Sequence, residues 1–398
     1  MEAPRSLSAL YHRGRSALRA LRGEDMMEAA REGPRVVQLV SCLNCGDAVG
    51  NEVAAMGEIL RRNRYASEIW TGWRHSRWDA LPVRVISRLP PLGRDDLLIY
   101  HFASQCPFAG EIASLPCRVL LRYHNVTPST YFHGYDAAAE SATANALRQL
   151  PEILPAVDGC LPASRFSAED LRLRGYGGPL EVLPVLLRWE DYTRPPDAAW
   201  LRRYRDGVIN VLSVGRIVPN KHLEDVISAY AVFHERHPRS RLILAGSYGE
   251  EDGYYRFLQR HIRQLGAEGV EFTGHIRFEE LLALYRAGDL YLCMSGHEGF
   301  CVPLVEAMAF GVPIAACRSS AVTETVGDGG LLFERGSFRA IADGMEELLA
   351  EREYWRQQEA RQLRSFDYAH IQRRFLSLLT PAGPEMPFPF DSLGGGGL

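Results

Sequence analysis

The chain contains 398 residues, of which 46% are hydrophobic and 24% are charged, a length and composition that allow two globular domains with separate cores. Its formal net charge of -4 excludes the strongly basic surface that binds a nucleic-acid backbone. We therefore expect no nucleic-acid partner, whereas a nucleotide ligand is compatible with this charge.

The first 33 residues precede any strand pattern. Leucines recur at roughly helical spacing between residues 5 and 22, with arginines among them, which predicts a basic amphipathic helix. This segment either lies as a helix on an anionic membrane surface, which would suit a lipid-linked acceptor, or is an ordinary helix packed on the first domain or a frayed tail. No apolar stretch approaches the roughly 20 residues that span a bilayer, and the secretory-signal pattern is missing. We expect a cytoplasmic protein with at most a peripheral contact with the inner face of the membrane.

Eight cysteines are too few, in a chain of this length, for a disulfide scaffold. Most of them lie inside apolar runs such as LYLCMS and PIAACR, which predicts buried free thiols. Cys42 and Cys45 form a CxxC motif, but neither a second CxxC nor a spaced pair of histidines accompanies it. We predict no metal site and no cofactor.

Short apolar runs alternate with helix-length segments from residue 34 to residue 190. The strand candidates are RVVQLVS (35–41), DLLIYHF (96–102), RVLLRYHN (118–125), DGCLP (158–162) and LEVLPVL (180–186). This alternation predicts a parallel sheet covered by helices on both faces. A polar segment with prolines, RWEDYTRPPDAAW (188–200), then interrupts the rhythm and is the predicted connection between two domains.

The same rhythm restarts within residues 205–365. Its strand candidates are VINVLSV (208–214), SRLILAG (240–246), VEFTG (270–274), DLYLCMS (289–295) and VPIAAC (312–317), with helices near 222–236, 253–265 and 278–287. A last helix is predicted near 366–380, and residues 381–398 are interpreted as a flexible tail. The predicted fold class is α/β, with two facing Rossmann-like doubly wound domains and a ligand site in the cleft between them.

The most informative segment is HEGFCVPLVEAMAFGVPIAA, which runs from His297 to Ala316 directly after a strand candidate. A strand, a turn containing Gly299 and a new helix follow one another, so N–H groups at the helix start are predicted to point into the cleft and bind phosphate. Glu298 precedes this helix and Glu306 lies within it. Each carboxylate can accept two hydrogen bonds from neighbouring hydroxyls, either of a ribose or of a hexose.

This segment resembles the retaining glycosyltransferases of family 4, whose two facing Rossmann-like domains form the glycosyltransferase B fold. The resemblance rests on EGFCVPLVE, in which two glutamates flank seven residues, and on the following AMAFGVPIAA. It implies that Glu298 contacts hydroxyls of the transferred sugar and that Glu306 holds the nucleotide ribose. It also implies that sugar and diphosphate meet the backbone of the residues between them: Phe300, Cys301, Val302, Pro303 and Leu304. The first domain, completed by the helix at 366–380, would bind the acceptor.

A second match to this family is SVGRIVPNKH, in which Gly215, Arg216 and Lys221 follow a strand candidate. Two cations at the end of a parallel strand can reach both phosphates of a nucleotide diphosphate. In a cleft that excludes part of the water, their attraction to the phosphates is stronger than in bulk water. Arg216 and Lys221 are therefore candidate catalytic residues that stabilise the leaving nucleotide diphosphate, with surface cations around an ordinary turn as the alternative. The chain lacks a D-x-D triplet, so we expect this neutralisation to replace a metal ion.

In the first domain, GDAVGNE places Gly46 and Gly50 directly before a helical pattern, where backbone can approach a ligand closely. It is not the G-x-G-x-x-G fingerprint, which argues against a nicotinamide enzyme. By resemblance, the loop from Gly46 to Asn51 faces the donor phosphates and the acceptor; a simple turn is the alternative.

Two histidines end neighbouring strand candidates of the first domain. In family 4 a histidine at a comparable strand end lies near the transferred sugar, and His124 is the best match, followed by His101. A structural histidine is the alternative for either. Ser164 and Arg165 resemble the strand-turn-helix near the family's hinge, without a predicted catalytic role.

Two further turns of the second domain fit the nucleotide side of the pocket: one contains Gly246, and the other contains Gly274, His275 and Ile276. Base recognition there uses backbone groups, so the side chains do not identify the base. Asp289 is interpreted as the start of a strand.

The sequence thus predicts a retaining, metal-independent hexosyltransferase of polysaccharide biosynthesis. It would move a hexose from a nucleotide-diphosphate sugar to a hydroxyl of a glycan, glycolipid or small-molecule acceptor, with GDP-mannose or a UDP-sugar as favoured donors. No carboxylate nucleophile is evident, so the resemblance implies that the leaving phosphate oxygen helps to deprotonate the acceptor. The alternatives are a sugar-nucleotide 2-epimerase, which needs no acceptor, and a non-catalytic nucleotide-sugar sensor, which would not require Glu298.

Overall fold

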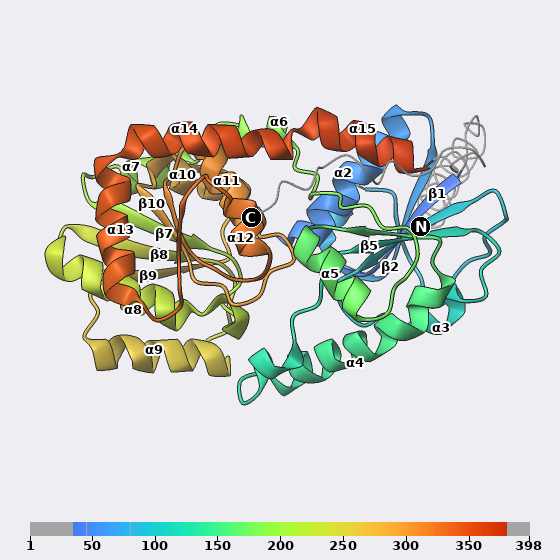
Figure 1. Cartoon of the computed structure of the whole chain (residues 1–398), viewed down its shortest axis with the longest axis horizontal. Coiled ribbons are helices and arrows are strands. Elements are labelled where there is room, and N and C mark those ends of the chain that lie inside the picture. The colour runs from blue at the N-terminus through green and yellow to red at the C-terminus, as the bar shows by residue number, and fades with distance from the viewer. Residues whose placement is uncertain (1–34, 45, 80, 380–398) are drawn as a thin grey trace, which may run out of the picture.

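The computed structural model of the chain describes residues 35–44, 46–79 and 81–379. Two six-stranded parallel sheets, each covered by helices, lie beside each other (Figure 1). This arrangement confirms the predicted fold class. Within the described residues, no helix combines the length and the apolar character needed to cross a bilayer.

The first domain consists of the first sheet and the helices that cover it. Its strands are β1 Arg35–Leu43, β2 Ala66–Arg74, β3 Val83–Val85, β4 Leu97–Phe102, β5 Arg118–Tyr123 and β6 Gly159–Pro162. Their order is β3-β2-β1-β4-β5-β6, so the order reverses between β1 and β4. The helices are α2 Ala48–Arg62, α3 Ala109–Ile112, α4 Ala137–Ile153 and α5 Arg165–Leu173. Every residue of β4 is buried, as expected for a central strand covered on both faces.

The second sheet repeats this arrangement with the order β12-β11-β10-β7-β8-β9. Its strands are β7 Ile209–Val214, β8 Ser240–Ala245, β9 Val270–Gly274, β10 Leu290–Cys293, β11 Ile314–Cys317 and β12 Leu331–Phe333. The helices are α7 Ala198–Tyr204, α8 Leu223–Arg236, α9 Gly253–Leu265, α10 Phe278–Ala287, α11 Val302–Phe310, α12 Ser320–Val326, α13 Phe338–Ala350 and α14 Arg352–Gln362. The order reverses between β10 and β7, which is where doubly wound sheets bind ligands.

Two segments join the domains. The short helix α6 Trp189–Tyr192 lies in the connection that leads into the second domain. The last helix, α15 Tyr368–Leu379, continues from α14 and returns across the first domain (Figure 1). Its buried residues Ile371 and Phe375 belong to the same apolar cluster as Val36 of β1. The chain end is therefore part of the first domain's core.

The predicted strand at 180–186 is wrong. Only Leu180 forms a bridge, with Cys160, and the backbone N–H groups of Glu181 and Leu183 donate to carbonyls of β6 over a short stretch. In this register the intervening hydrogen bond would come from the N–H group of residue 162, but Pro162 of β6 has none, so the segment stays extended without becoming a strand.

Several expectations fall on residues outside the described ranges: the basic helix within residues 5–22, Cys45 of the CxxC motif and the tail at 381–398. Among the described cysteines, the prediction of buried free thiols is confirmed for Cys106, Cys117, Cys160, Cys293, Cys301 and Cys317, whereas Cys42 is half-buried.

A carboxyl group is buried in α14 without compensation. Glu359 is 0% exposed, and neither carboxyl oxygen has a hydrogen-bond partner among the described residues. Burial raises the pKa of Glu359 to about 9. Between about pH 4.5 and pH 9 the folded chain therefore holds a proton that the unfolded chain has released, and the free energy of unfolding falls as the pH rises.

We expect Glu359→Gln to remove this pH dependence and to stabilise the fold by roughly 4 to 5 kcal/mol at pH 8. Thermal unfolding from pH 5 to pH 9 measures the effect, with Glu353→Gln on the exposed side of α14 as the control. A Glu359→Gln melting temperature that follows the wild-type pH profile would contradict this account.

Candidate active site

A cavity lies at the carboxyl ends of β7 and β10. It is lined by Ser213, Val214, Gly215, Arg216, Lys221, Leu223, Tyr291, Cys293, Met294, Ser295 and Cys301. Four of these are predicted site residues, and they come from the two segments SVGRIVPNKH and EGFCVPLVE. Because β7 and β10 are neighbours in the sheet, their following turns meet at one edge.

The ammonium group of Lys221 forms an ion pair with the carboxylate of Glu298, 77 positions later in the chain. The two side chains are only 18% and 11% exposed. Burial opposes the charge on Lys221, but the adjoining carboxylate outweighs this effect and raises the Lys221 pKa above its ordinary value. Lys221 is also the only lysine of the chain, so this cavity holds its single ε-amino group.

The turn after β7 brings a second cation to the site. Gly215 has a φ of +142°, a conformation that other residues rarely adopt, and its backbone lies against the lysine, since a Cβ there would lie 3.4 Å from Cε of Lys221. Arg216 is exposed, and its charge opposes the rise that burial causes in the pKa of Asp47. Asp47 caps the N-terminus of α2 in the other domain, so Arg216 faces the space between the domains.

The turn before α11 is shaped by backbone geometry. Cys301 adopts the left-handed conformation with a φ of +72°, and Pro303 stands in the first turn of the helix. The N–H group of Glu298 donates to Oγ of Ser320 over 2.9 Å. These constraints fix the carboxylate of Glu298 beside the cavity.

The apolar residues of the same segment point into packed interiors. Phe300 belongs to a buried cluster that includes Val185 from before α6, and Val302 packs against it. Leu304 is 0% exposed in the core of the second domain. A ligand at this turn would therefore meet their backbone and not their side chains.

The Glu298 turn is docked directly onto the first domain. A Cβ on Gly299 would lie 2.0 Å from the carbonyl oxygen of His124, which is closer than any side chain allows. Oγ of Ser167 donates to the Gly299 carbonyl over 3.3 Å and accepts from Nδ2 of Asn125 over 3.1 Å. The end of β5 is thus in contact with the turn that carries Glu298.

Glu306 lies away from the Lys221 cavity, in a polar pocket of its own. Its carboxylate oxygens accept hydrogen bonds from the hydroxyls of Tyr192 (2.6 Å) and Tyr285 (2.8 Å). Glu306 is 6% exposed, and burial raises its pKa in spite of these two bonds. A hydroxyl that bound Glu306 would have to share or replace the bond to Tyr192.

The predicted loop of the first domain reaches the second domain. Gly46 has a φ of +73°, and a Cβ there would lie 3.0 Å from Cε1 of His275. The N–H group of Gly50 donates to the capping carboxylate of Asp47 over 2.6 Å. Asn51 is exposed in the first turn of α2. The structure therefore brings Gly46 and His275 together across the domain boundary.

The remaining predicted positions have structural surroundings. A Cβ on Gly246 would lie 1.8 Å from the Gly215 carbonyl, so the turns after β7 and β8 touch. Gly274 ends β9, and Ile276 packs against the second domain's core. The carboxylate of Asp289, directly before β10, accepts from Arg352 over 2.9 Å.

Ser164 and Arg165 lie at the start of α5. Oγ of Ser164 caps the helix by accepting from the N–H group of Ser167 over 3.0 Å. The N–H groups of Arg165 and Phe166 donate to the carboxylate of Glu324, which belongs to the second domain. An acidic side chain of one domain therefore caps a helix of the other.

The family model described as glycosyl transferases group 1 matches residues 203–364, which contain both segments that line the cavity. A GDP-mannose-dependent alpha-(1-6)-phosphatidylinositol monomannoside mannosyltransferase from Mycolicibacterium smegmatis is 30% identical over 283 residues, 67% of this chain and 71% of that protein. The chain belongs to the group 1 glycosyltransferases.

Other relatives are similar to this glycosyltransferase over a smaller part of its sequence. The O-antigen chain mannosyltransferase B of Escherichia coli is 31% identical over 171 residues, 41% of this chain and 39% of that protein. Mannosylfructose-phosphate synthase of Agrobacterium fabrum is 34% identical over 146 residues, 35% of this chain and 29% of that protein. The chain thus spans well under half the length of these two relatives.

Solved structures share the fold of this glycosyltransferase. Sucrose-phosphate synthase from Thermosynechococcus elongatus superimposes with a TM-score of 0.67 and 17% identity over 87% of this chain and 98% of that chain. Anabaena HepE in complex with UDP-glucose superimposes with a TM-score of 0.67 and 18% identity, over 87% of this chain and 99% of that chain. These likenesses identify the glycosyltransferase B fold.

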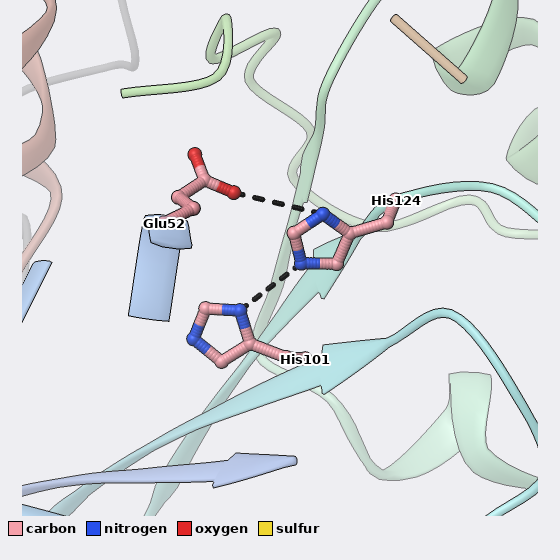
Figure 2. Close-up of side chains that lie close together, drawn as sticks. All are labelled: Glu52, His101 and His124. Carbon is pink, nitrogen blue, oxygen red and sulfur yellow. Dashed lines mark hydrogen bonds and ion pairs between the residues drawn. The ribbon is translucent and has the colours of Figure 1, made fainter. Parts of the chain in front are cut away.

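The sequence predictions missed a buried polar network around His124, of which Figure 2 shows Glu52, His101 and His124. Nε and Nη2 of Arg122 donate to Glu52 over 3.1 and 2.7 Å, and both side chains are 0% exposed. Gln38 and His101 extend this network along β1 and β4. The signal was present: Gln38 and Arg122 each interrupt an apolar strand run, and a buried polar side chain requires a buried partner.

The docking of Gly299 on His124 makes a prediction for this glycosyltransferase. Gly299→Ala would force the Glu298 turn away from the first domain by more than an ångström, and we expect about a 100-fold loss of donor turnover. Release of nucleotide from a sugar donor measures it. The control is Gly177→Ala, where an added Cβ meets nothing within 4 Å. Wild-type turnover in Gly299→Ala would refute the role of this contact.

Proposed function

We propose that this chain is a retaining, metal-independent hexosyltransferase, with GDP-mannose as the donor to test first and a UDP-hexose as the second. The observation that carries the proposal is the Lys221–Glu298 ion pair, with Lys221 lining the cavity at the strand ends and Glu298 beside it. Two relatives are named as mannosyltransferases, and one of them as GDP-mannose-dependent. UDP-glucose enters as the second donor class because HepE, a fold neighbour, binds it.

In this proposal Lys221 and Arg216 neutralise the diphosphate of the donor. Lys221 then exchanges its bond to Glu298 for a phosphate oxygen, and Glu298 accepts bonds from hydroxyls of the transferred sugar. The fixed ammonium and guanidinium groups act where negative charge develops on the leaving nucleotide. This pair of cations takes the place of a metal ion, in agreement with the lack of a D-x-D triplet.

The rest of the donor follows from these contacts. The backbone from Gly299 to Leu304 contacts the sugar and the diphosphate. Glu306 binds the ribose, whose hydroxyl replaces the Tyr192 hydroxyl as a hydrogen-bond donor to the carboxylate. The turns containing Gly246 and His275, with Ile276, receive the base. The loop from Gly46 to Asn51 faces the donor phosphates.

The acceptor enters from the first domain as a hydroxyl of a glycan, a glycolipid or a small molecule. Its proton goes to the leaving phosphate oxygen on the same face of the sugar, which retains the anomeric configuration. Glu298 and His124 orient the sugar during this step. A peripheral membrane contact through residues 5–22 would suit a glycolipid acceptor.

The test is nucleotide release from GDP-, UDP-, ADP- and dTDP-sugars, with and without chelator. We expect turnover of one donor that survives chelation and falls by about 100- to 1,000-fold in Lys221→Ala and in Glu298→Ala. Arg239→Ala, an exposed arginine of the same domain, is the control.

Other outcomes separate the alternatives. Donors that stay intact with every acceptor, while nucleotides still bind, would support a sensor and overturn the catalytic roles. Interconversion of two sugar nucleotides without an acceptor would support an epimerase. Loss of turnover with chelator would refute the metal-independent step.

A further inference from the structure

Three side chains meet at the carboxyl ends of β4 and β5, under the Glu298 turn. Glu52 comes from α2, His101 from β4 and His124 from the residue after β5 (Figure 2). Nδ1 of His101 lies 3.0 Å from Nε2 of His124, and Nδ1 of His124 lies 3.6 Å from Glu52. The positions of the protons in this cluster decide what His124 can bind.

Gln38 fixes the proton on His101. Its Nε2 donates to the carbonyl of Val53 over 3.1 Å, because the reversed amide would place two oxygens against each other. Oε1 of Gln38 therefore faces Nε2 of His101 over 3.0 Å and accepts its proton. Burial, with the nearby charge of Arg122, lowers the pKa of His101 to about 3, so the ring is neutral. A neutral ring protonated at Nε2 has a bare Nδ1.

His101 in turn fixes the proton on His124. The bare Nδ1 of His101 accepts a hydrogen bond, so Nε2 of His124 must donate it. Burial and the charge of Arg122 hold the pKa of His124 well below its ordinary value. Nδ1 of His124 then carries a lone pair, and its 3.6 Å separation from Glu52 is too long for a hydrogen bond.

Glu52, His101 and His124 have the spacing of metal ligands, but their atoms are already engaged. Glu52 accepts from Nε and Nη2 of Arg122 and from the N–H group of Leu186. Both nitrogens of His101 have partners, and the guanidinium of Arg122 would repel a cation. The contacts describe a hydrogen-bonded chain and not a metal cage.

We infer that His101, held by Gln38, is a positioning residue that locks His124 into the tautomer with a protonated Nε2 and a bare Nδ1. His124 is the outer member of the cluster: its side chain is 7% exposed, whereas Glu52 is 0% exposed, and its carbonyl touches Gly299. Resting on the proposed function, His124 accepts a hydrogen bond from a hydroxyl of the donor sugar at Nδ1 and does not donate a proton to it.

The test is 15N NMR of histidine-labelled protein, with the His124 signals assigned through His124→Gln. We expect a protonated Nε2 and an unprotonated Nδ1 on His124 at neutral pH. Gln38→Glu favours a doubly protonated His101, which donates from Nδ1, so the proton of His124 should move to its own Nδ1. His133→Gln, at an exposed histidine outside the cluster, should leave the His124 signals unchanged.

Donor turnover is the second measurement that tests the role of His101. Gln38→Glu and His101→Phe should each lower kcat/KM for the donor by about tenfold, the loss expected for one hydrogen bond. A protonated Nδ1 on wild-type His124, or Zn²⁺ binding that His101→Phe abolishes, would overturn the inference. The NMR signals do not require turnover, so a wrong tautomer and a wrong proposed function give different results.

Discussion

The ion pair between Lys221 and Glu298 is the interaction on which the site depends. The two charges are largely buried and compensate each other, so each side chain fixes the position of the other. The pair exists because β7 and β10 are neighbours, which brings two turns 77 positions apart to one sheet edge. In the proposed function a diphosphate replaces the carboxylate as the partner of Lys221, and the released carboxylate meets the sugar. A single exchange of partners at Lys221 would then provide the contacts both for the diphosphate and for the sugar of the donor.

The first domain matters because it touches the same turn. Gly299 rests on the His124 carbonyl, and Glu324 of α12 caps α5 across the boundary. Beneath His124, the buried Arg122–Glu52 pair and the His101 ring leave few ways for the end of β5 to move. Contacts of this kind connect the first domain to Glu298 through packed groups and not through a flexible loop. A substitution in the first domain can therefore alter donor turnover without touching the donor.

The sequence predicted the fold class and four of the residues that line the Lys221 cavity, because strand rhythm and turn composition are local signals. It did not predict the partners of Glu306: Tyr192 and Tyr285 come from elements whose contacts only the folded chain brings together. It also assigned a strand to 180–186, because the pairing that fails there depends on Pro162 in the neighbouring strand β6 and not on the apolar segment itself. The polar network around His124 could be predicted from the sequence only in part. Gln38 and Arg122 indicate buried partners, but their patterns do not say which.

The most direct test of the account uses the fact that Lys221 is the only lysine. Amine acylation followed by mass spectrometry reports one internal site, and the N-terminal amine serves as a reference in the same sample. A saturating nucleotide sugar should slow acylation of Lys221 and leave the N-terminal amine unaffected, because the diphosphate covers the ammonium group. Acylation of Lys221 at the same rate with and without a donor shown to bind would contradict the central role given to the Lys221–Glu298 pair.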